Sequence, residues 1–133
     1  MDTITEAHDT KLRQLEHQFC EAVDLYVDPV TFDGRDCNDC IVGQIGYAIG
    51  AFIPVPDGNM GTDKTPNGLS ADDDEIPFAL AEHMAKGRGL SEEDFTAFVN
   101  KVTSIYNIVV GLNYWEAKKY AYEVMRCLTD QGH

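Results

Sequence analysis

The sequence predicts an all-α fold, a single small helical domain over residues 1–133 of about five helices, with a long loop near residues 54–75. Three observations support this prediction. Apolar residues recur at three- and four-residue spacing along most of the chain, which is typical of amphipathic helices. Capping residues and Gly or Pro stops separate these runs. A chain of 133 residues also suffices for one sizeable core and is too short for two.

The first helix is predicted over about residues 5–26. Asp28 and Pro29 end it, because the residue before a proline avoids helical backbone geometry. We expect one apolar stripe of this helix to face the core: Leu12, Leu15, Phe19, Ala22, Val23 and Tyr26.

The second helix is predicted to start near Asn38 or Asp39, either of which can cap it, and to stop before Pro54. Three glycines, at positions 43, 46 and 50, share a face away from its apolar stripe. Because glycine destabilises a helix interior by about 1 kcal/mol relative to alanine, we expect another backbone to pack closely there. The apolar stripe consists of Ile41, Ile45, Ala48, Ile49 and Phe52.

Between these helices and the next, residues 57–75 are rich in Gly, Pro, Asn, Thr and Asp and predict an exposed loop. A third helix is predicted from about Ile76 to Lys86. Acidic residues precede its start, where the helix dipole is positive, and Gly87 closes it.

The last two helices have recognisable starts. Ser91 is predicted to cap the fourth helix, with Asp94 in the position of a capping-box acid, and Gly111 ends it. Asn113 and Glu116 form a similar start for a fifth helix, which is predicted to run to about residue 129. The core face predicted for this fifth helix is Trp115, Ala121, Tyr122, Met125 and Leu128.

Two stretches resemble a known group of proteins. The segment DCIVGQ, residues 39–44, resembles the "SCIVG" helix start of small uncharacterised helical proteins of actinobacteria and their phages. Residues 105–117 resemble the "QxxQDxGxxWxxA" helix pair near the end of those proteins, although the glutamines and the aspartate of that pattern are replaced. The matching positions are Asn107, Gly111, Trp115 and Ala117. The resemblance implies a helical fold and a phage origin, and it transfers no catalytic residue.

The charge of the chain restricts its partners. It carries 23 acidic and 10 basic residues, a net charge of −13. Nucleic-acid phosphates and anionic membranes repel such a chain, so we expect neither direct nucleic-acid binding nor membrane binding. A solvated acidic surface explains the charge, as does complementarity to a basic partner, including mimicry of nucleic acid. The predicted partner-binding residues are Asp72, Asp73, Asp74, Glu75, Glu92, Glu93, Tyr114 and Tyr120.

The four cysteines allow several interpretations. In a reducing cytosol we expect thiols or metal ligands rather than disulfides. His17, Cys20, Cys37 and Cys40 have the types and spacing of a structural zinc site, although core packing explains the same cysteines. Cys37 and Cys40 also form a C-x-x-C pair, the arrangement of thiol oxidoreductases.

The sequence therefore predicts a non-enzymatic protein-interaction or regulatory protein, phage-related, that binds a basic partner through an acidic surface. The alternatives are a zinc-stabilised structural module and a C-x-x-C thiol oxidoreductase. No catalytic motif and no cofactor-binding motif other than the zinc set is present. The N-terminus lacks the pattern of a secretory signal, so we expect a cytoplasmic protein. The glycine face of the second helix and the aromatic last helix are each interpreted either as the contact of a homodimer or as a packing surface within the chain.

Overall fold

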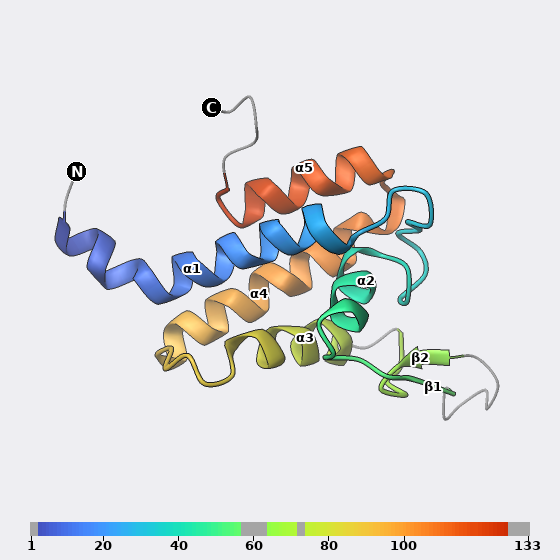
Figure 1. The fold of residues 1–133 in the computed structure, drawn as a ribbon, viewed down its shortest axis with the longest axis horizontal. Helices are drawn as coiled ribbons and strands as arrows, with labels where there is room; N and C mark the ends of the chain where they lie inside the picture. The colour runs from blue at the N-terminus through green and yellow to red at the C-terminus, as the bar shows by residue number, and fades with distance from the viewer. Residues whose placement is uncertain (1–2, 57–63, 72–73, 128–133) are drawn as a thin grey trace.

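The computed structural model describes residues 3–56, 64–71 and 74–127; two of the predicted binding residues, Asp72 and Asp73, lie outside these ranges. The elements are α1 (Thr3–Tyr26), α2 (Ile41–Ala48), β1 (Pro54–Pro56), β2 (Lys64–Pro66), α3 (Glu75–Ala85), α4 (Glu92–Ile108), the 3-10 turn η1 (Val109–Gly111) and α5 (Tyr114–Val124). Helix α4 contacts α1, α2, α3 and α5, so it is the centre of the bundle, while α2 closes one end (Figure 1).

The fold is mostly helical, as the sequence predicts, but it is not purely α. Strands β1 and β2 pair antiparallel and place Val55 opposite Thr65. This hairpin falls in the segment predicted as loop, because the three prolines of its two strands are typical structure breakers. Asn67 follows β2 in the left-handed region, at φ 54°. Its side chain accepts from the Ile53 N–H at 2.9 Å and donates to the Ala51 carbonyl at 3.1 Å, which fixes the hairpin to the end of α2.

The predicted apolar stripe of α1 is buried, with one exception at its end. Leu15, Phe19 and Val23 are fully buried, whereas Tyr26 is 44% exposed. Burying each of these large side chains contributes about 1.5–3 kcal/mol to folding. The facing core side chains come from every other helix: Ile41, Ile45, Ile76, Leu80, Phe98, Val102, Ile105, Ala117, Ala121 and Met125.

Helix α2 differs from its prediction in start, length and burial. Cys40 caps it instead of Asn38 or Asp39, because the Cys40 Sγ accepts from the Gly43 N–H at 3.4 Å. The helix ends at Ala48, whose side chain is exposed rather than in the core stripe.

The predicted close approach at the glycine face of α2 is confirmed at Gly43. A Cβ at Gly43 would collide with the backbone of Cys37 and Asn38. At Gly46 the neighbour is the ring of Phe52, a side chain rather than a backbone. Gly50 lies beyond the helix at φ +83°, with open space around it. Two of the three glycines are therefore covered by this chain itself.

The predicted caps of the last two helices are confirmed. Ser91 accepts from the Asp94 N–H at 3.1 Å. Asn113 accepts from the Glu116 N–H at 2.8 Å, and the Glu116 carboxylate accepts from the Asn113 N–H at 3.0 Å, which completes a capping box. Helix α5, however, ends at Val124 rather than near residue 129, because Arg126 adopts a left-handed conformation at φ 57°.

Candidate functional site

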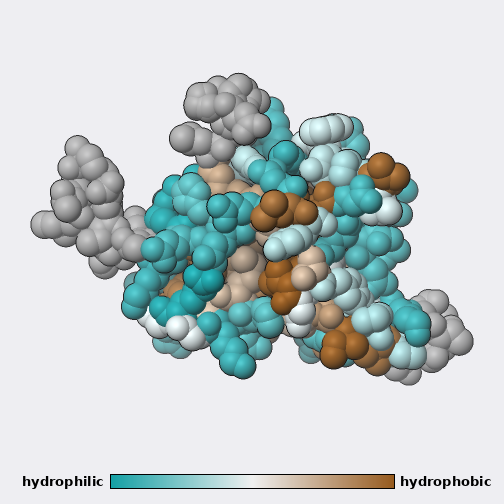
Figure 2. Space-filling model, in the orientation of Figure 1, coloured by the Kyte–Doolittle hydropathy of each residue, from teal (hydrophilic) through white to brown (hydrophobic). Residues whose placement is uncertain are grey.

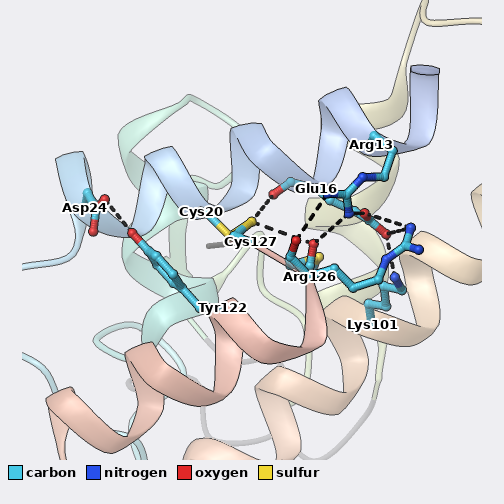
Figure 3. The surroundings of a disulfide bond; sticks show 9 residues. Arg13, Glu16, Cys20, Asp24, Lys101, Tyr122, Arg126 and Cys127 are labelled. Atoms are coloured by element: carbon cyan, nitrogen blue, oxygen red, sulfur yellow. Dashed lines mark hydrogen bonds and ion pairs between the residues drawn. A yellow bond between two sulfur atoms is a disulfide. The ribbon is translucent and has the colours of Figure 1, made fainter. Parts of the chain in front are cut away.

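The expectation that all four cysteines are thiols or metal ligands is wrong for two of them. Cys20 of α1 and Cys127, which follows α5, form a disulfide with a Cα–Cα distance of 6.8 Å across 107 residues of sequence (Figure 3). A sulfur atom in a disulfide is not available as a zinc ligand. His17 lies exposed one turn earlier on α1. The predicted four-ligand zinc set is therefore not assembled, and no group of three or more His, Cys, Asp or Glu within the described ranges is arranged to hold a metal ion.

The other two cysteines remain thiols at the start of α2. Burial raises the pKa of the Cys40 thiol to about 12, and the backbone N–H groups of Gly43 and Val42 only partly offset that shift. The thiolate is the nucleophile in thiol–disulfide chemistry. Cys40 is consequently protonated at neutral pH, which argues against Cys40 as the attacking thiol of the C-x-x-C oxidoreductase alternative.

The predicted acidic binding residues within the described ranges do not form one patch. They fall in two exposed pairs, Asp74 with Glu75 at the start of α3, and Glu92 with Glu93 at the start of α4. Asn107, near the end of α4, donates to the Asp74 carboxylate at 3.4 Å, so the two helices are antiparallel. The pairs thus lie at opposite ends of α4, about 25 Å apart for a helix of 17 residues.

On α5, the structure reverses the predicted burial of Tyr114 and Trp115. Tyr114, expected in an interface, is buried and makes edge-on ring contacts with Phe32 at 6.0 Å and Trp115 at 4.9 Å. Tyr120 is half-buried. Trp115, expected in the core, is 68% exposed. The exposed aromatic side chain of α5 that is best placed for a partner is therefore Trp115.

A different set of acidic residues gathers around the start of α2. The connection from α1 to α2, residues 28–39, contains four aspartates and one basic residue, Arg35. Three of the aspartates accept a hydrogen bond from a backbone N–H two residues later, at 2.8–2.9 Å. Such Asx turns hold the loop in one conformation. These three are Asp28, Asp33 and Asp36.

The negative potential of this loop affects neighbouring groups. Partial burial raises the pKa of the Asp39 carboxyl, and the charges of Asp36 and Asp33 raise it further. Burial also raises the pKa of Tyr47 to about 12, with further contributions from Cys37, Asp36 and Asp39. The Tyr47 hydroxyl donates to the Asn38 side chain at 2.5 Å. Asp36 and Asp33 are thus close enough to oppose the ionisation of Asp39.

The same loop packs directly against the end of α4, because a Cβ at Gly34 would collide with the Val109 carbonyl. Between the loop and residues 110–114 lies an open groove of about 450 Å³, lined by Pro29, Phe32 and Asp33 on one side and Val110 and Tyr114 on the other.

Exposed apolar side chains line this groove or adjoin its lining residues in sequence. Val30 is 89% exposed and Val110 is 48% exposed, and Trp115 follows the groove residue Tyr114. We call residues 28–39 together with 109–115 the acidic end face; both segments lie at the same end of the bundle in Figure 1. Elsewhere, the side of the molecule drawn in Figure 2 is mostly hydrophilic, with separate hydrophobic patches.

The acidic end face carries a signal in the sequence that the predictions did not use. Aspartates at positions 33, 36 and 39 repeat every third residue immediately before a helix. The contact between Gly34 and Val109 decides which other side chains lie near these aspartates, and these two residues are 75 positions apart in sequence (109 − 34). Local patterns carry no information on such a contact.

Comparisons with known proteins bring no relative to this chain: no family model, no curated protein and no solved structure matches it. Within residues 3–56, 64–71 and 74–127, no helix is both long enough and apolar enough to cross a membrane.

Proposed function

We propose that this protein is a non-enzymatic interaction domain that binds a basic, partly apolar segment of a partner protein at the acidic end face. One observation carries the proposal: Trp115, 68% exposed, stands beside a groove whose other wall is an aspartate-rich loop. Tryptophan is enriched at the energetic centres of protein interfaces, because it buries a large area with few rotatable bonds.

Electrostatics supports a basic occupant. The raised pKa of Asp39, due to burial and then to the charges of Asp36 and Asp33, reflects crowded negative charge. A Lys or Arg side chain placed among these carboxylates would relieve that repulsion. Complementary charge of this kind accelerates association and excludes acidic competitors.

The site is also held in place before any partner arrives. Trp115 packs against the ring of Tyr114, and the Lys118 ammonium lies 5.9 Å from the Trp115 ring centroid. The capping box of Asn113 and Glu116 fixes the start of α5 beneath it. A preorganised site loses less conformational entropy on binding.

A homodimer remains a second proposal, through one of the two predicted surfaces. Gly43 and Gly46 of α2 are covered by this chain's own residues, so the predicted glycine face is not open to a second copy. The exposed apolar residues Val110 and Trp115 support the aromatic last helix as the contact instead. The cytoplasmic location and the phage origin stay predictions.

The experiment uses Trp115, which is the single tryptophan of the chain, as its reporter. Short synthetic peptides rich in Lys, Arg and Leu are titrated into the protein while Trp115 fluorescence is recorded. We expect saturable spectral shifts that weaken as salt is added. Acidic peptides of the same length should produce none. A Trp115 spectrum that no basic peptide changes would contradict the proposal.

Matched variants locate the binding. The double variant Asp33→Asn, Asp36→Asn loses two negative charges. Its amide oxygens still accept the hydrogen bonds of the Asx turns, so the loop conformation is kept. We expect affinity to fall about tenfold or more. The control, Glu92→Gln and Glu93→Gln combined, removes the same charge from the far end of α4, beyond the Debye length of about 8 Å at physiological salt. Equal losses in both variants would show that net charge alone attracts the peptides.

A further inference from the structure

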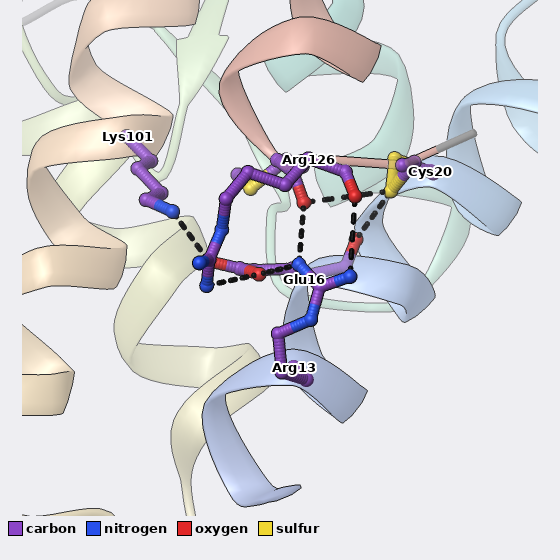
Figure 4. Close-up of polar contacts among 7 residues, drawn as sticks. Arg13, Glu16, Cys20, Lys101 and Arg126 are labelled. Carbon is purple, nitrogen blue, oxygen red and sulfur yellow. Dashed lines mark hydrogen bonds and ion pairs between the residues drawn. A yellow bond between two sulfur atoms is a disulfide. The ribbon is translucent and has the colours of Figure 1, made fainter. Parts of the chain in front are cut away.

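The end of α5 is fastened to α1 by a covalent bond and an ion cluster that adjoin each other (Figures 3 and 4). The disulfide joins Cys20 to Cys127. One turn earlier on α1, Glu16 is completely buried, and its backbone carbonyl lies 3.6 Å from the Cys127 Sγ. Arg126, the residue before Cys127, donates to both carboxylate oxygens of Glu16, at 3.1 and 3.2 Å.

The Glu16 carboxylate receives two further cations. Arg13 donates to it at 2.7 Å, and the Lys101 ammonium of α4 forms an ion pair with it. Arg13 also donates to the Arg126 carbonyl at 3.2 Å. A buried carboxylate is tolerated because such partners compensate its lost hydration. Only one of its three cations, Arg126, belongs to the segment that the disulfide holds, so Glu16 stays paired when that segment leaves.

The fastened segment is itself in an unfavourable backbone conformation. Arg126 has φ 57°, a region in which residues other than glycine are uncommon. This turn ends α5, with the Cys127 N–H donating to the Tyr122 carbonyl at 2.9 Å and the Arg126 N–H to the Glu123 carbonyl at 3.2 Å. Releasing the segment would allow Arg126 to leave that conformation.

We propose that the Cys20–Cys127 disulfide is a redox latch that controls the docking of the end of α5 on α1. Oxidised, it holds Arg126 and Cys127 against Glu16. Reduced, it releases them, while the start of α5 stays in place. This regulatory device is independent of the function proposed for the acidic end face. Disulfides in the cytosol of mesophiles are usually transient or redox-sensing, whereas those of oxidising compartments are structural.

The chemistry requires a dithiol reductant. One thiolate of the dithiol attacks the Cys127 Sγ, the sulfur of the less buried residue, and forms a mixed disulfide while Cys20 leaves as a thiolate and takes a proton. The second thiol of the reductant then attacks its own sulfur in the mixed disulfide, and Cys127 leaves as a thiol. Two electrons and two protons pass to the protein, and the dithiol becomes a disulfide.

Contacts nearer the middle of α5 confine the opening to its end. The Tyr122 hydroxyl donates to the Asp24 carboxylate at 2.5 Å, and Lys118 pairs with the same carboxylate at 2.9 Å. These bonds join α5 to α1 independently of the disulfide. The amides of Arg126 and Cys127 should therefore respond to reduction, and those at the start of α5 should not.

Hydrogen exchange of the full chain, with and without dithiothreitol, tests the latch. We expect alkylation of the denatured chain to detect two thiols before reduction and four after it, since Cys37 and Cys40 are already thiols. Exchange of the Arg126 and Cys127 amides should accelerate about tenfold or more on reduction. The Val109 amide, bonded to the Ile105 carbonyl of α4, reports global unfolding and should stay protected on the time scale at which the Arg126 and Cys127 amides of the reduced protein exchange.

Variants separate the latch from a purely structural bond. Cys20→Ala and Cys127→Ala combined should show the fast exchange without reductant, and Cys37→Ala should respond to dithiothreitol like the original chain. Three outcomes would overturn the proposal: four thiols before reduction, unchanged exchange at Arg126 and Cys127 after it, or exchange of Val109 on the same time scale as Arg126 and Cys127. The last would mean that reduction opens the whole fold and not the end of α5 alone.

Discussion

The two ends of α5 are held by opposite means. At its start, a capping box and ring contacts among near neighbours position Trp115, and the exposed groups there are free to meet a partner. At its end, Cys127 and Arg126 depend on residues of α1 that are more than a hundred positions away in sequence. The start should therefore resist reductant and respond to salt, whereas the end should respond to reductant. The following predictions test that contrast, from the largest expected effect to the smallest.

The largest effect on stability is expected from removing the disulfide. Closing a loop of about 100 residues is worth about 4.7 kcal/mol in the chain-entropy account, and typical measured values are about 2–4 kcal/mol. We expect Cys20→Ala with Cys127→Ala to lose about 2–4 kcal/mol in urea unfolding. Cys37→Ala is the control for cysteine removal as such. A double variant as stable as the original chain would show that the covalent bond contributes nothing to the fastened end.

The second-largest effect on stability is expected from removing Glu16, the centre of the ion cluster. Glu16→Ala leaves the Arg13, Lys101 and Arg126 cations without their shared carboxylate, and we expect a loss of about 3 kcal/mol. Glu21→Ala removes an exposed carboxylate from the same helix and should change the free energy of unfolding by less than about 0.5 kcal/mol. Urea unfolding of both variants in the oxidised state measures the difference. Similar values for the two would mean that the buried cluster is energetically neutral.

At the other end, Asp39 gives a pH dependence of known sign. Its pKa is raised in the folded state, by partial burial and then by Asp36 and Asp33, so the folded protein binds the proton more tightly than the unfolded chain. Stability from this group is present at acidic pH and is lost as pH rises through its folded pKa. We expect Asp39→Asn to raise the melting temperature at pH 7 and to have no such effect at pH 3. A constant difference at both pH values would contradict the assigned cause.

The smallest effect on stability is expected at Trp115. Because its side chain is exposed, Trp115→Ala should change the free energy of unfolding by less than about 0.5 kcal/mol, while peptide binding is lost. Circular dichroism follows the unfolding, and peptide binding is measured by calorimetry, since the variant has no tryptophan. Phe98→Ala, at a fully buried site, should by contrast cost about 3–5 kcal/mol. Intact peptide binding by Trp115→Ala would remove Trp115 from the proposed site.

Local signals predicted much of the fold. The stripe of α1 and the caps at Ser91 and Asn113 follow from spacing and from side-chain hydrogen bonding within three residues, and both are present. The hairpin was not predicted because Pro54 and Pro66 are residues that usually interrupt regular structure. A two-stranded sheet has only edge strands, however, and proline is tolerated there.

The candidate site was harder to predict, because non-local contacts decide it. Tyr114 and Trp115 are adjacent on α5, so either can face the core according to how the helix is rotated. Phe32, from the connection after α1, packs on Tyr114 and so favours its burial. The spacing of the cysteines does not predict the pairing of Cys20 with Cys127 either, since four cysteines allow three connectivities.

The same disulfide gives the chain a mechanical property. It turns the stretch from Cys20 to Cys127 into a closed ring, so a pulling force on the polypeptide passes through two sulfur atoms and bypasses the backbone between them. At about 3.5 Å per extended residue, the 107 residues of that ring hold back roughly 370 Å of contour length. When the oxidised protein is stretched, the ring between Cys20 and Cys127 should not extend, whereas in the reduced protein these residues should extend.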